Sequence, residues 1–266
     1  MKYGIVIDIE TTGYKRTKTV FYNSDGRKMS EAEMRAIPPE QVYLYNHEEI
    51  LDDSAEIVSV GYLRVDLDAD RIFDAGVLYF YKPYFHIEND AQKIHKLQRS
   101  FLEQYEDQFQ TNLAILESLL INSIIIGKNC DAFDIPYIEA FLKKHRGGKS
   151  LYPYINSQGM KNYDKKKLVL ENNTTSYDVQ TKFAPLYRGL MRKVHGVELS
   201  ERKKGTLTEY IELLDPERKD VNTLIEEIKS ITSDEFCATA HDAMYDVAMT
   251  YVVFKFLQEV AKRRNS

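Results

Sequence analysis

The sequence predicts an α/β fold with a mixed central sheet, in which an antiparallel hairpin joins parallel strands and helices flank the sheet. Three observations carry this prediction. The segment Tyr3–Ile9 is an apolar run that ends at acids, as a buried strand does. Glu56–Val65 and Arg71–Lys82 are two further strand patterns, and the short turn between them predicts a hairpin. Beyond residue 90, helical patterns alternate with short apolar strands, which is typical of such a sheet.

The other elements follow in chain order. Asp90–Leu120 has a helical pattern with a break near Ser100. The pattern next predicts a short buried strand at Ser123–Ile126 and a helix at Ala132–His145, which ends at the Gly147-Gly148 pair. It then predicts these elements: a strand at Thr175–Val179, a helix from there to about His195, and helices at Thr206–Leu214 and Ala243–Lys262.

Two polar stretches interrupt this pattern. Residues 14–54 contain Pro38-Pro39, and residues 150–174 are rich in Lys, Asn and Tyr. Neither stretch has enough apolar residues to build a core of its own. We therefore expect a single domain over residues 1–266, with insertions at 14–54 and 150–174.

Composition excludes several classes of protein. Of the 266 residues, 43% are hydrophobic and 29% are charged, which is ordinary for a globular protein and excludes a disordered chain. Asp8 and Glu10 interrupt the N-terminal apolar stretch, so we do not expect a signal peptide. The two cysteines, Cys130 and Cys237, are too few for a disulfide framework, and a cytoplasmic protein is expected. A net charge of −5 argues against wrapping long stretches of duplex.

The first candidate site residues are Asp8 and Glu10, which end the most apolar segment of the chain. In a strand their i, i+2 spacing puts both side chains on one face. Two acids there repel each other unless a positive charge lies between them, and hard divalent cations bind carboxylate oxygens well. The alternative is a pair of solvated acids at a strand end.

Three more residues stand beside apolar segments later in the chain. Asp134 follows a short apolar strand, and it either belongs to a site or satisfies free N–H groups at a helix start. Asp246 lies next to the apolar face of the last helix, where a lone acid is costly without a partner. His241, five residues earlier, is either a polar loop residue or a general base with a near-neutral pKa.

Together these residues form an ordered set that resembles the DEDDh 3′→5′ exonucleases of the ribonuclease H-like fold. The resemblance rests on three motifs: Val6–Gly13 (VIDIETTG), Gly127–Ile138 (GKNCDAFDIPYI) and His241–Asp246 (HDAMYD). Ala91–Leu102 is also similar to the family's A-x-x-I-H-G-I segment. The second motif departs from the commonest pattern, because Lys128 stands where His is usual. In the third motif Asp242 follows His241 where Gly is usual, and we expect Asp242 to cap the helix.

The resemblance implies a site and a mechanism. It implies that Asp8, Glu10, Asp134 and Asp246 bind two Mg²⁺ or Mn²⁺ ions and that His241 deprotonates the attacking water. It also implies that backbone groups of Thr11, Thr12 and Gly13 receive the terminal nucleotide, whereas Asn129 and Phe133 become substrate-binding candidates through their positions in the second motif. The expected product is a 5′ mononucleotide released from a 3′ end of single-stranded nucleic acid, with DNA favoured.

Four basic clusters are candidates for contact with the substrate backbone, although a solvated loop or helix end is the commoner role of such a cluster. They are Lys143–Arg146, Lys161–Lys167, Arg202–Lys204 and Lys262–Arg264. We favour the second cluster, with Lys165 and Lys166, because tyrosines lie among its lysines and can stack on bases.

Two other functions stay open at this point. One is a non-catalytic or proofreading accessory subunit that binds a polymerase or another replication protein. The other is a 3′→5′ exoribonuclease, since nothing in the sequence reports a contact with a 2′-hydroxyl group. The filled chemical positions favour the active enzyme.

Overall fold

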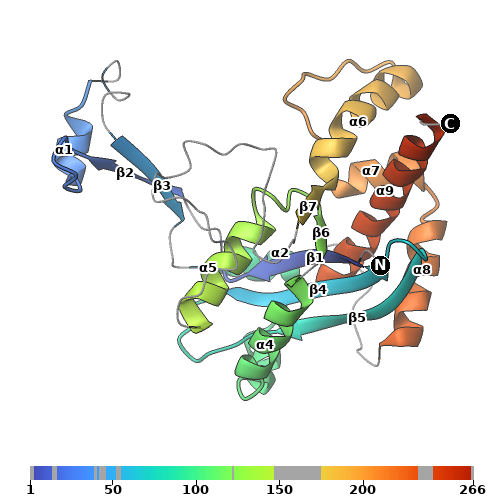
Figure 1. Ribbon diagram of the computed structural model, residues 1–266, viewed down its shortest axis with the longest axis horizontal. Helices are drawn as coiled ribbons and strands as arrows, with labels where there is room; N and C mark the ends of the chain where they lie inside the picture. The colour runs from blue at the N-terminus through green and yellow to red at the C-terminus, as the bar shows by residue number, and fades with distance from the viewer. Residues whose placement is uncertain are drawn as a thin grey trace.

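The computed structural model describes residues 3–13, 17–38, 41, 46–51, 55–121, 123–146, 175–232 and 242–264. Within these ranges a five-stranded mixed sheet with the order β5-β4-β1-β6-β7 forms the centre of the molecule (Figure 1). Its strands are β1 (Tyr3–Thr11), β4 (Ile57–Asp66), β5 (Arg71–Tyr79), β6 (Ile124–Gly127) and β7 (Thr175–Asp178). β4 and β5 form the expected antiparallel hairpin, and β6 and β7 run parallel to β1. The predicted mixed sheet is therefore confirmed.

β1 is central because both of its faces are apolar. Ile5, Ile7 and Ile9 pack into one hydrophobic cluster, and Val6 packs into a second. Successive side chains of a strand point to opposite faces, so the two clusters lie on the two sides of the sheet. Helices α4 (Phe109–Leu120) and α5 (Asp134–Arg146) contribute to the first cluster.

The second cluster is built from the C-terminal half of the chain. Its helices are α6 (Val179–His195), α7 (Leu207–Leu214), α8 (Lys219–Ile231) and α9 (Ala243–Arg264). The sequence analysis missed α8. Its buried residues Val221, Leu224, Ile225 and Ile228 have the i, i+3, i+4, i+7 spacing of an amphipathic helix, so the signal was present.

The helical stretch before β6 is divided more than the sequence predicted. It contains α2 (Asn89–His95), α3 (Arg99–Leu102), the 3₁₀ turn η2 (Glu103–Tyr105) and α4. Its first interruption comes just before the predicted break, at Lys96, where a positive φ of 61° ends α2. A second interruption separates η2 from α4.

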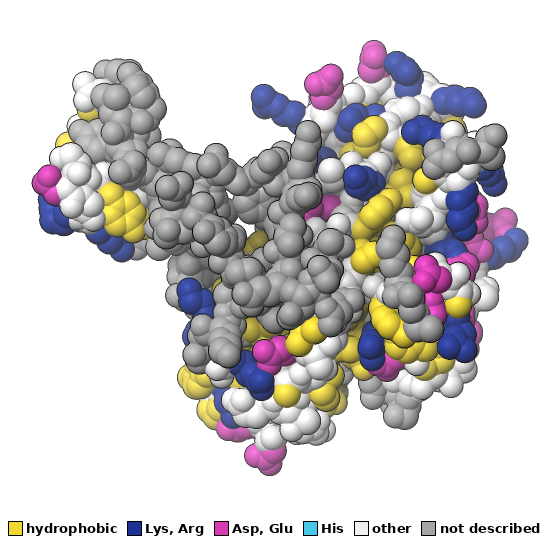
Figure 2. Space-filling view, in the orientation of Figure 1, with side chains coloured by type: hydrophobic (Ala, Val, Ile, Leu, Met, Phe, Trp, Pro, Cys, Tyr) yellow, Lys and Arg dark blue, Asp and Glu magenta, His cyan; other side chains and the backbone are white. Residues whose placement is uncertain are grey.

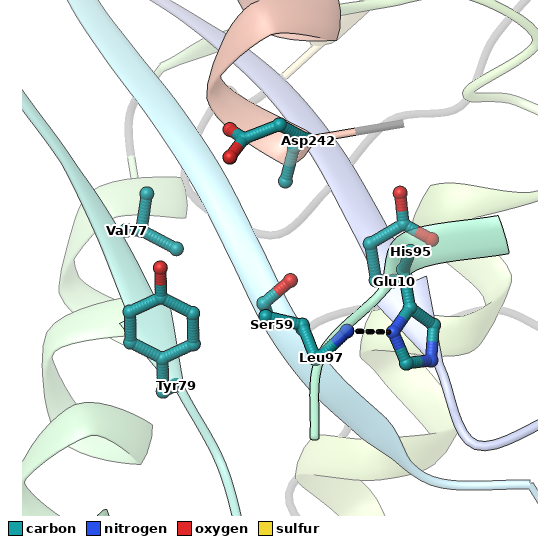
Figure 3. A pocket seen from close by; sticks show the side chains of 8 residues that line it. Glu10, Ser59, Val77, Tyr79, His95, Leu97 and Asp242 are labelled. Carbon is teal, nitrogen blue, oxygen red and sulfur yellow. Dashed lines mark hydrogen bonds between the residues drawn. The ribbon is translucent and has the colours of Figure 1, made fainter. Parts of the chain in front are cut away.

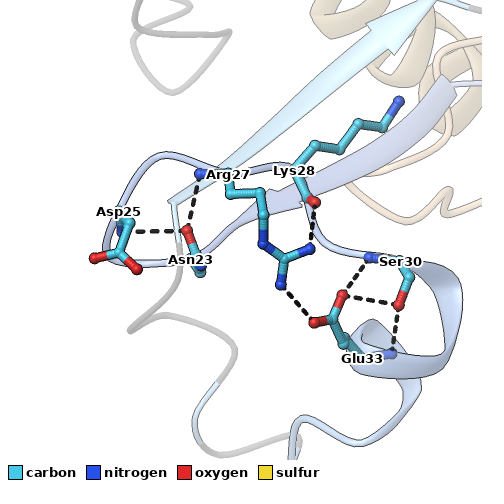
Figure 4. Close-up of polar contacts among 6 residues, drawn as sticks. All are labelled: Asn23, Asp25, Arg27, Lys28, Ser30 and Glu33. Carbon is cyan, nitrogen blue, oxygen red and sulfur yellow. Dashed lines mark hydrogen bonds and ion pairs between the residues drawn. The ribbon is translucent and has the colours of Figure 1, made fainter.

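Part of the first polar stretch has structure of its own. β2 (Thr17–Tyr22) and β3 (Asn46–Leu51) form an antiparallel pair, and α1 (Glu31–Arg35) follows β2; Figure 1 shows them set apart from the central sheet. Ser30 and Glu33 form a capping box at the start of α1, and Arg27 pairs with Glu33 at 2.6 Å (Figure 4). Residues 147–174 lie outside the described ranges, so the single domain with two insertions stays a prediction.

No helix in the described part of the chain is long and apolar enough to cross a membrane.

Candidate functional site

The carboxylates predicted from the sequence come from elements that meet at one edge of the sheet. Because β1, β6 and β7 are parallel, their carboxyl ends lie together. Asp8 and Glu10 belong to the end of β1, and Asp134 starts α5 directly after β6. Asp246 lies in the first turn of α9.

Asp134 faces the first strand. Its side chain is 3% exposed, and its Oδ1 accepts a hydrogen bond of 3.2 Å from the backbone N–H of Ile9. Ile9 lies between Asp8 and Glu10, so this bond fastens the start of α5 to the strand that bears both acids. Asp134 thus contacts β1 in addition to lying in the first turn of its own helix.

Asp246 reaches the site because Gly61 lets α9 approach the sheet. Gly61 lies opposite Asp8 in the β1–β4 ladder. A Cβ atom on Gly61 would lie 2.6 Å from the backbone carbonyl carbon of Ala243, the first residue of α9. Sequence reasoning missed Gly61, although glycine inside a strand signals a close backbone approach.

The charges of the neighbouring acids act on Asp8 and Glu10. Burial raises the pKa of Asp8, and the charges of Asp246, Asp134 and Glu10 raise it further. Burial, together with the charges of Asp246, Asp134 and Asp242, raises the pKa of Glu10 to about 8. Enough positive charge nearby would have lowered the pKa values of Asp8 and Glu10. The protein therefore supplies too little positive charge to balance these acids.

Burial also raises the pKa of Asp134, to about 7. The charge of Asp178 acts in the same direction, whereas Lys128 and the hydrogen bond from Ile9 oppose the shift. A buried carboxyl group with this pKa exchanges its proton readily near neutral pH, which is a property of many functional sites.

The donor chemistry of this cluster fits a hard divalent cation, because such ions take carboxylate oxygens and supply the missing positive charge. In the described ranges, however, no group of three or more His, Cys, Asp or Glu side chains is arranged as a metal site. The structure therefore brings Asp8, Glu10, Asp134 and Asp246 into electrostatic range without setting them at ligand positions.

The predicted nucleotide-receiving turn is tightly held. The Thr12 hydroxyl accepts a 2.8 Å hydrogen bond from the N–H of Glu56, and the Thr12 N–H donates to the Glu56 carbonyl. The Thr11 hydroxyl donates to the carbonyl of Gly13, also at 2.8 Å. The side chain of Glu88 fills the space where a Cβ atom of Gly13 would be. Both threonine hydroxyls thus fix the turn beside Glu10.

The loop between β6 and α5 places the other two candidates from the second motif. Asn129 has a positive φ of 62°, and its backbone N–H donates to Asp178 Oδ1 at 3.1 Å. The same oxygen accepts from Thr181 and so caps α6. Phe133 is half-buried, with its ring centroid 4.5 Å from that of Tyr137. Sequence reasoning missed Asp178, which an acid between a strand and a helix could have signalled.

A pocket opens next to Glu10 (Figure 3). The residues that line it are Glu10, Ser59, Val77, Tyr79, His95, Leu97, Asp242 and Ala243. Burial lowers the pKa of His95 to about 4, so its ring is neutral at pH 7. Because Nδ1 accepts a 3.0 Å bond from the Leu97 N–H, the proton of the neutral ring is on Nε2, a buried atom on the side of the Thr11 backbone, which opposes the lowering of the pKa.

Three predicted residues, His241, Lys165 and Lys166, lie outside the described ranges. Asp242 is described, and its predicted capping role is confirmed. Its Oδ1 accepts a 3.0 Å hydrogen bond from the Met244 N–H, and its carbonyl accepts from the N–H of Asp246. The same residue lines the pocket beside Glu10, so capping places a further acid near the site.

Comparisons with known proteins support the fold. By sequence, no protein-family model and no curated protein matches the chain. By structure, it matches solved DEDDh 3′-exonucleases over nearly its whole length at low identity. One is E. coli exonuclease I with a dT13 oligonucleotide, at TM-score 0.52 and 14% identity over 97% of this chain and 41% of that chain.

Two other structures of exonuclease I give similar values. The zinc-bound E. coli enzyme with single-stranded DNA matches at TM-score 0.52 and 14% identity, over 99% of this chain and 41% of the other. A product-bound form of exonuclease I matches at TM-score 0.50 and 12% identity, over 99% of this chain and 46% of that chain. The chain thus spans less than half the length of these relatives. The predicted ribonuclease H-like fold is confirmed, and at these identities the likeness extends to the fold alone.

Proposed function

We propose that this protein is a 3′→5′ exonuclease that releases 5′ mononucleotides from single-stranded nucleic acid, with DNA as the favoured substrate. One observation carries the proposal: four acids from three segments gather at one sheet edge, where the charges of Asp134 and Asp246 raise the pKa values of Asp8 and Glu10. Repulsion among buried carboxylates lowers the stability of the fold, and a protein that only binds nucleic acid gains nothing from it. The fold shared with exonuclease I supports the same conclusion.

Asp8, Glu10, Asp134 and Asp246 are the residues that would hold two Mg²⁺ or Mn²⁺ ions. Such ions supply positive charge for the scissile phosphate and make water a better nucleophile at neutral pH. His241 would accept the proton of the attacking water, a contribution of about 10²–10⁴ in rate.

The chain's own groups beside the acids would position the end of the strand. The turn Thr11–Gly13 presents backbone groups next to Glu10, and the pocket with His95 adjoins the same side chain.

A degradation assay tests the proposal. Matched DNA and RNA strands, labelled at the 3′ or the 5′ end, are incubated with Mg²⁺, Mn²⁺ or a chelator. We expect metal-dependent release of mononucleotides from the 3′ end, lost by orders of magnitude in Asp8→Asn and Asp246→Asn. Asp25→Asn serves as the control, because Asp25 is an exposed acid in the turn that follows β2.

The other outcomes separate the alternatives. Degradation of RNA but not DNA would make the protein an exoribonuclease. Binding of strands without release of nucleotides, at any metal concentration, would overturn the enzyme and favour the accessory subunit. An unchanged rate in His241→Ala would remove the general base.

A further inference from the structure

Helix α6 is positively charged although the chain as a whole is acidic. It contains Lys182, Arg188, Arg192 and Lys193 but no Asp or Glu, in a chain with a net charge of −5. Its N-terminus is capped by Asp178, whose charge raises the pKa of Asp134. A cationic helix therefore starts at the edge of the sheet that carries the acids.

The segment after α6 brings a second group of cations to the same helix. The Arg188 guanidinium donates to the carbonyl of Lys203 at 3.3 Å, and the Gln180 side chain donates to the carbonyl of Gly205 at 3.3 Å. The hydroxyl of Tyr210 donates to the carbonyl of Lys204. The Arg202–Lys204 cluster found in the sequence is thus fastened beside α6 by three side chains of α6 and α7.

These cations are largely uncompensated. In the described part of the chain, no carboxylate lies within ion-pair distance of Arg192, Lys193, Arg202 or Lys204, whereas Lys203 pairs with Glu209 at 3.5 Å. All four side chains are exposed. Figure 2 shows Lys and Arg side chains gathered over the region that α6 occupies in Figure 1, with acidic side chains at its upper edge. The segment after α6 contributes the exposed acids Glu198 and Glu201, which the cations of the region outnumber. Such a surface attracts a polyanion.

We propose that this surface binds the phosphate backbone of the substrate strand, upstream of the 3′ end that lies at the acids. We name it the α6 basic surface; it comprises Lys182, Arg188, Arg192, Lys193, Arg202 and Lys204. The proposal rests on the proposed function and adds the path of the strand. The 17 residues of α6 extend for about 25 Å, so the surface serves nucleotides several positions from the cleaved bond.

Lys182 marks the start of this path. It lies one turn into α6, and its Nζ is 5.9 Å from the ring centroid of Tyr177 on β7. Arg192 and Lys193 lie near the far end of the helix. A strand that follows the surface would meet cations along the whole helix, and its affinity would therefore grow with its length and fall with salt.

Binding of a trinucleotide and of a strand of roughly 12 nucleotides, a length within known single-strand site sizes, tests the proposal. Fluorescence anisotropy is measured in Ca²⁺ at several salt concentrations. The test variant is Arg192→Gln/Lys193→Gln/Lys204→Gln. The control is Lys28→Gln/Lys219→Gln/Lys229→Gln, which removes the same charge from exposed sites elsewhere. Thermal melting of each variant shows that the fold is kept.

We expect the test variant to bind the long strand about tenfold more weakly than wild type, with a salt slope smaller by about 2. The trinucleotide should lose much less affinity, and the control should behave as wild type with both strands. Equal losses in the two variants, or an unchanged salt slope, would overturn the α6 basic surface. Because binding needs no hydrolysis, these results are independent of the degradation assay, which tests the proposed function.

Discussion

Gly61 of β4 and Ala243 of α9 are in direct backbone contact. This contact places the start of the last helix against the sheet at the residue opposite Asp8. A Cβ atom at residue 61 would lie 2.6 Å from the carbonyl carbon of Ala243 and 2.7 Å from its oxygen. Backbone atoms cannot rotate away as a flexible side chain can. Any larger residue must therefore move the first turn of α9, which carries Asp246.

Gly61→Ala should therefore lower both stability and activity. Overpacking of this kind costs about 1–3 kcal/mol in the free energy of unfolding. Gly189→Ala is the matched control, because Gly189 lies inside α6 with no atom near its missing Cβ, and it should stabilise the protein by about 0.5–1 kcal/mol. Chemical denaturation and 3′-end release measure the two effects. Equal stability of the two variants would show that the helix adjusts freely.

The metal-free protein should lose stability as the pH rises. The pKa values of Glu10 and Asp134 in the folded protein, about 8 and about 7, exceed their ordinary values of 4.5 and 3.8. Proton binding thus favours the folded state: the stabilisation is complete below about pH 4 and is lost as the pH rises through about 7 to 8. Thermal melting with a chelator from pH 5 to 8.5 should show a falling Tm.

Asp134→Asn should flatten this pH dependence, because it removes one ionisable group and can keep the bond from Ile9. Added Mg²⁺ should raise the Tm of wild type most at high pH. A wild-type Tm that is constant over this range without metal would contradict the assignment of buried, mutually repelling acids.

The ionised side chain of Glu56 should stabilise the protein, in contrast to the ionised side chains of Glu10 and Asp134. Its side chain is 5% exposed, pairs with Lys144, and lies 2.9 Å from Nε2 of His145. Burial raises the pKa of Glu56, but the bonds from His145 and Lys144 outweigh it, and the pKa lies below its ordinary value of 4.5. The stabilisation is therefore present above about pH 4.5 and is lost as the pH falls.

Glu56→Gln should lower the free energy of unfolding at pH 7 by about 1–3 kcal/mol, because it takes the carboxylate partner from the buried ring of His145 and from the exposed Lys144. Glu33→Gln breaks the exposed pair with Arg27, and this loss of stability should be much smaller because solvent screens the pair. Urea denaturation at pH 7 compares the two. A smaller loss in Glu56→Gln than in Glu33→Gln would refute the prediction.

Asp178 allows charge and hydrogen bonding to be separated. Asp178→Asn keeps an oxygen for both backbone donors but removes the charge that raises the pKa of Asp134, so that pKa should fall with little change in stability. Asp178→Ala removes both bonds and should cost about 1–2 kcal/mol. NMR titration of the Asp134 carboxyl carbon and thermal melting measure these effects. Identical stability of the Ala and Asn variants would exclude the capping role.

The sequence predicted the central sheet well because its strands are long or strongly apolar, as Tyr3–Ile9 shows. It pointed to a shared site for Asp8, Glu10, Asp134 and Asp246 through the resemblance of three motifs, because each acid alone beside an apolar element has a purely structural alternative. It could not predict the contacts that complete the arrangement. Gly61 acts by having no side chain, and its role depends on α9, which follows far along the chain.

Asp178 was missed for a related reason: its acceptor oxygen serves a distant N–H, that of Asn129, as well as its own helix. α8 was missed although its apolar spacing is regular, because most of its other residues are charged or polar. The sequence also did not predict the pairing of β2 with β3 inside residues 14–54. More than twenty residues separate the two strands, and they give little apolar signal.

The shared oxygen of Asp178 has a consequence for local motion. The N–H groups of Asn129 and Thr181 donate to the same oxygen atom of Asp178. If that carboxylate rotates away, the bend before α5 and the start of α6 lose these hydrogen bonds together. The two amides should therefore exchange with deuterium as one cooperative unit, with equal opening free energies. Two stretches of chain nearly fifty residues apart are thus joined through one atom beside Asp134.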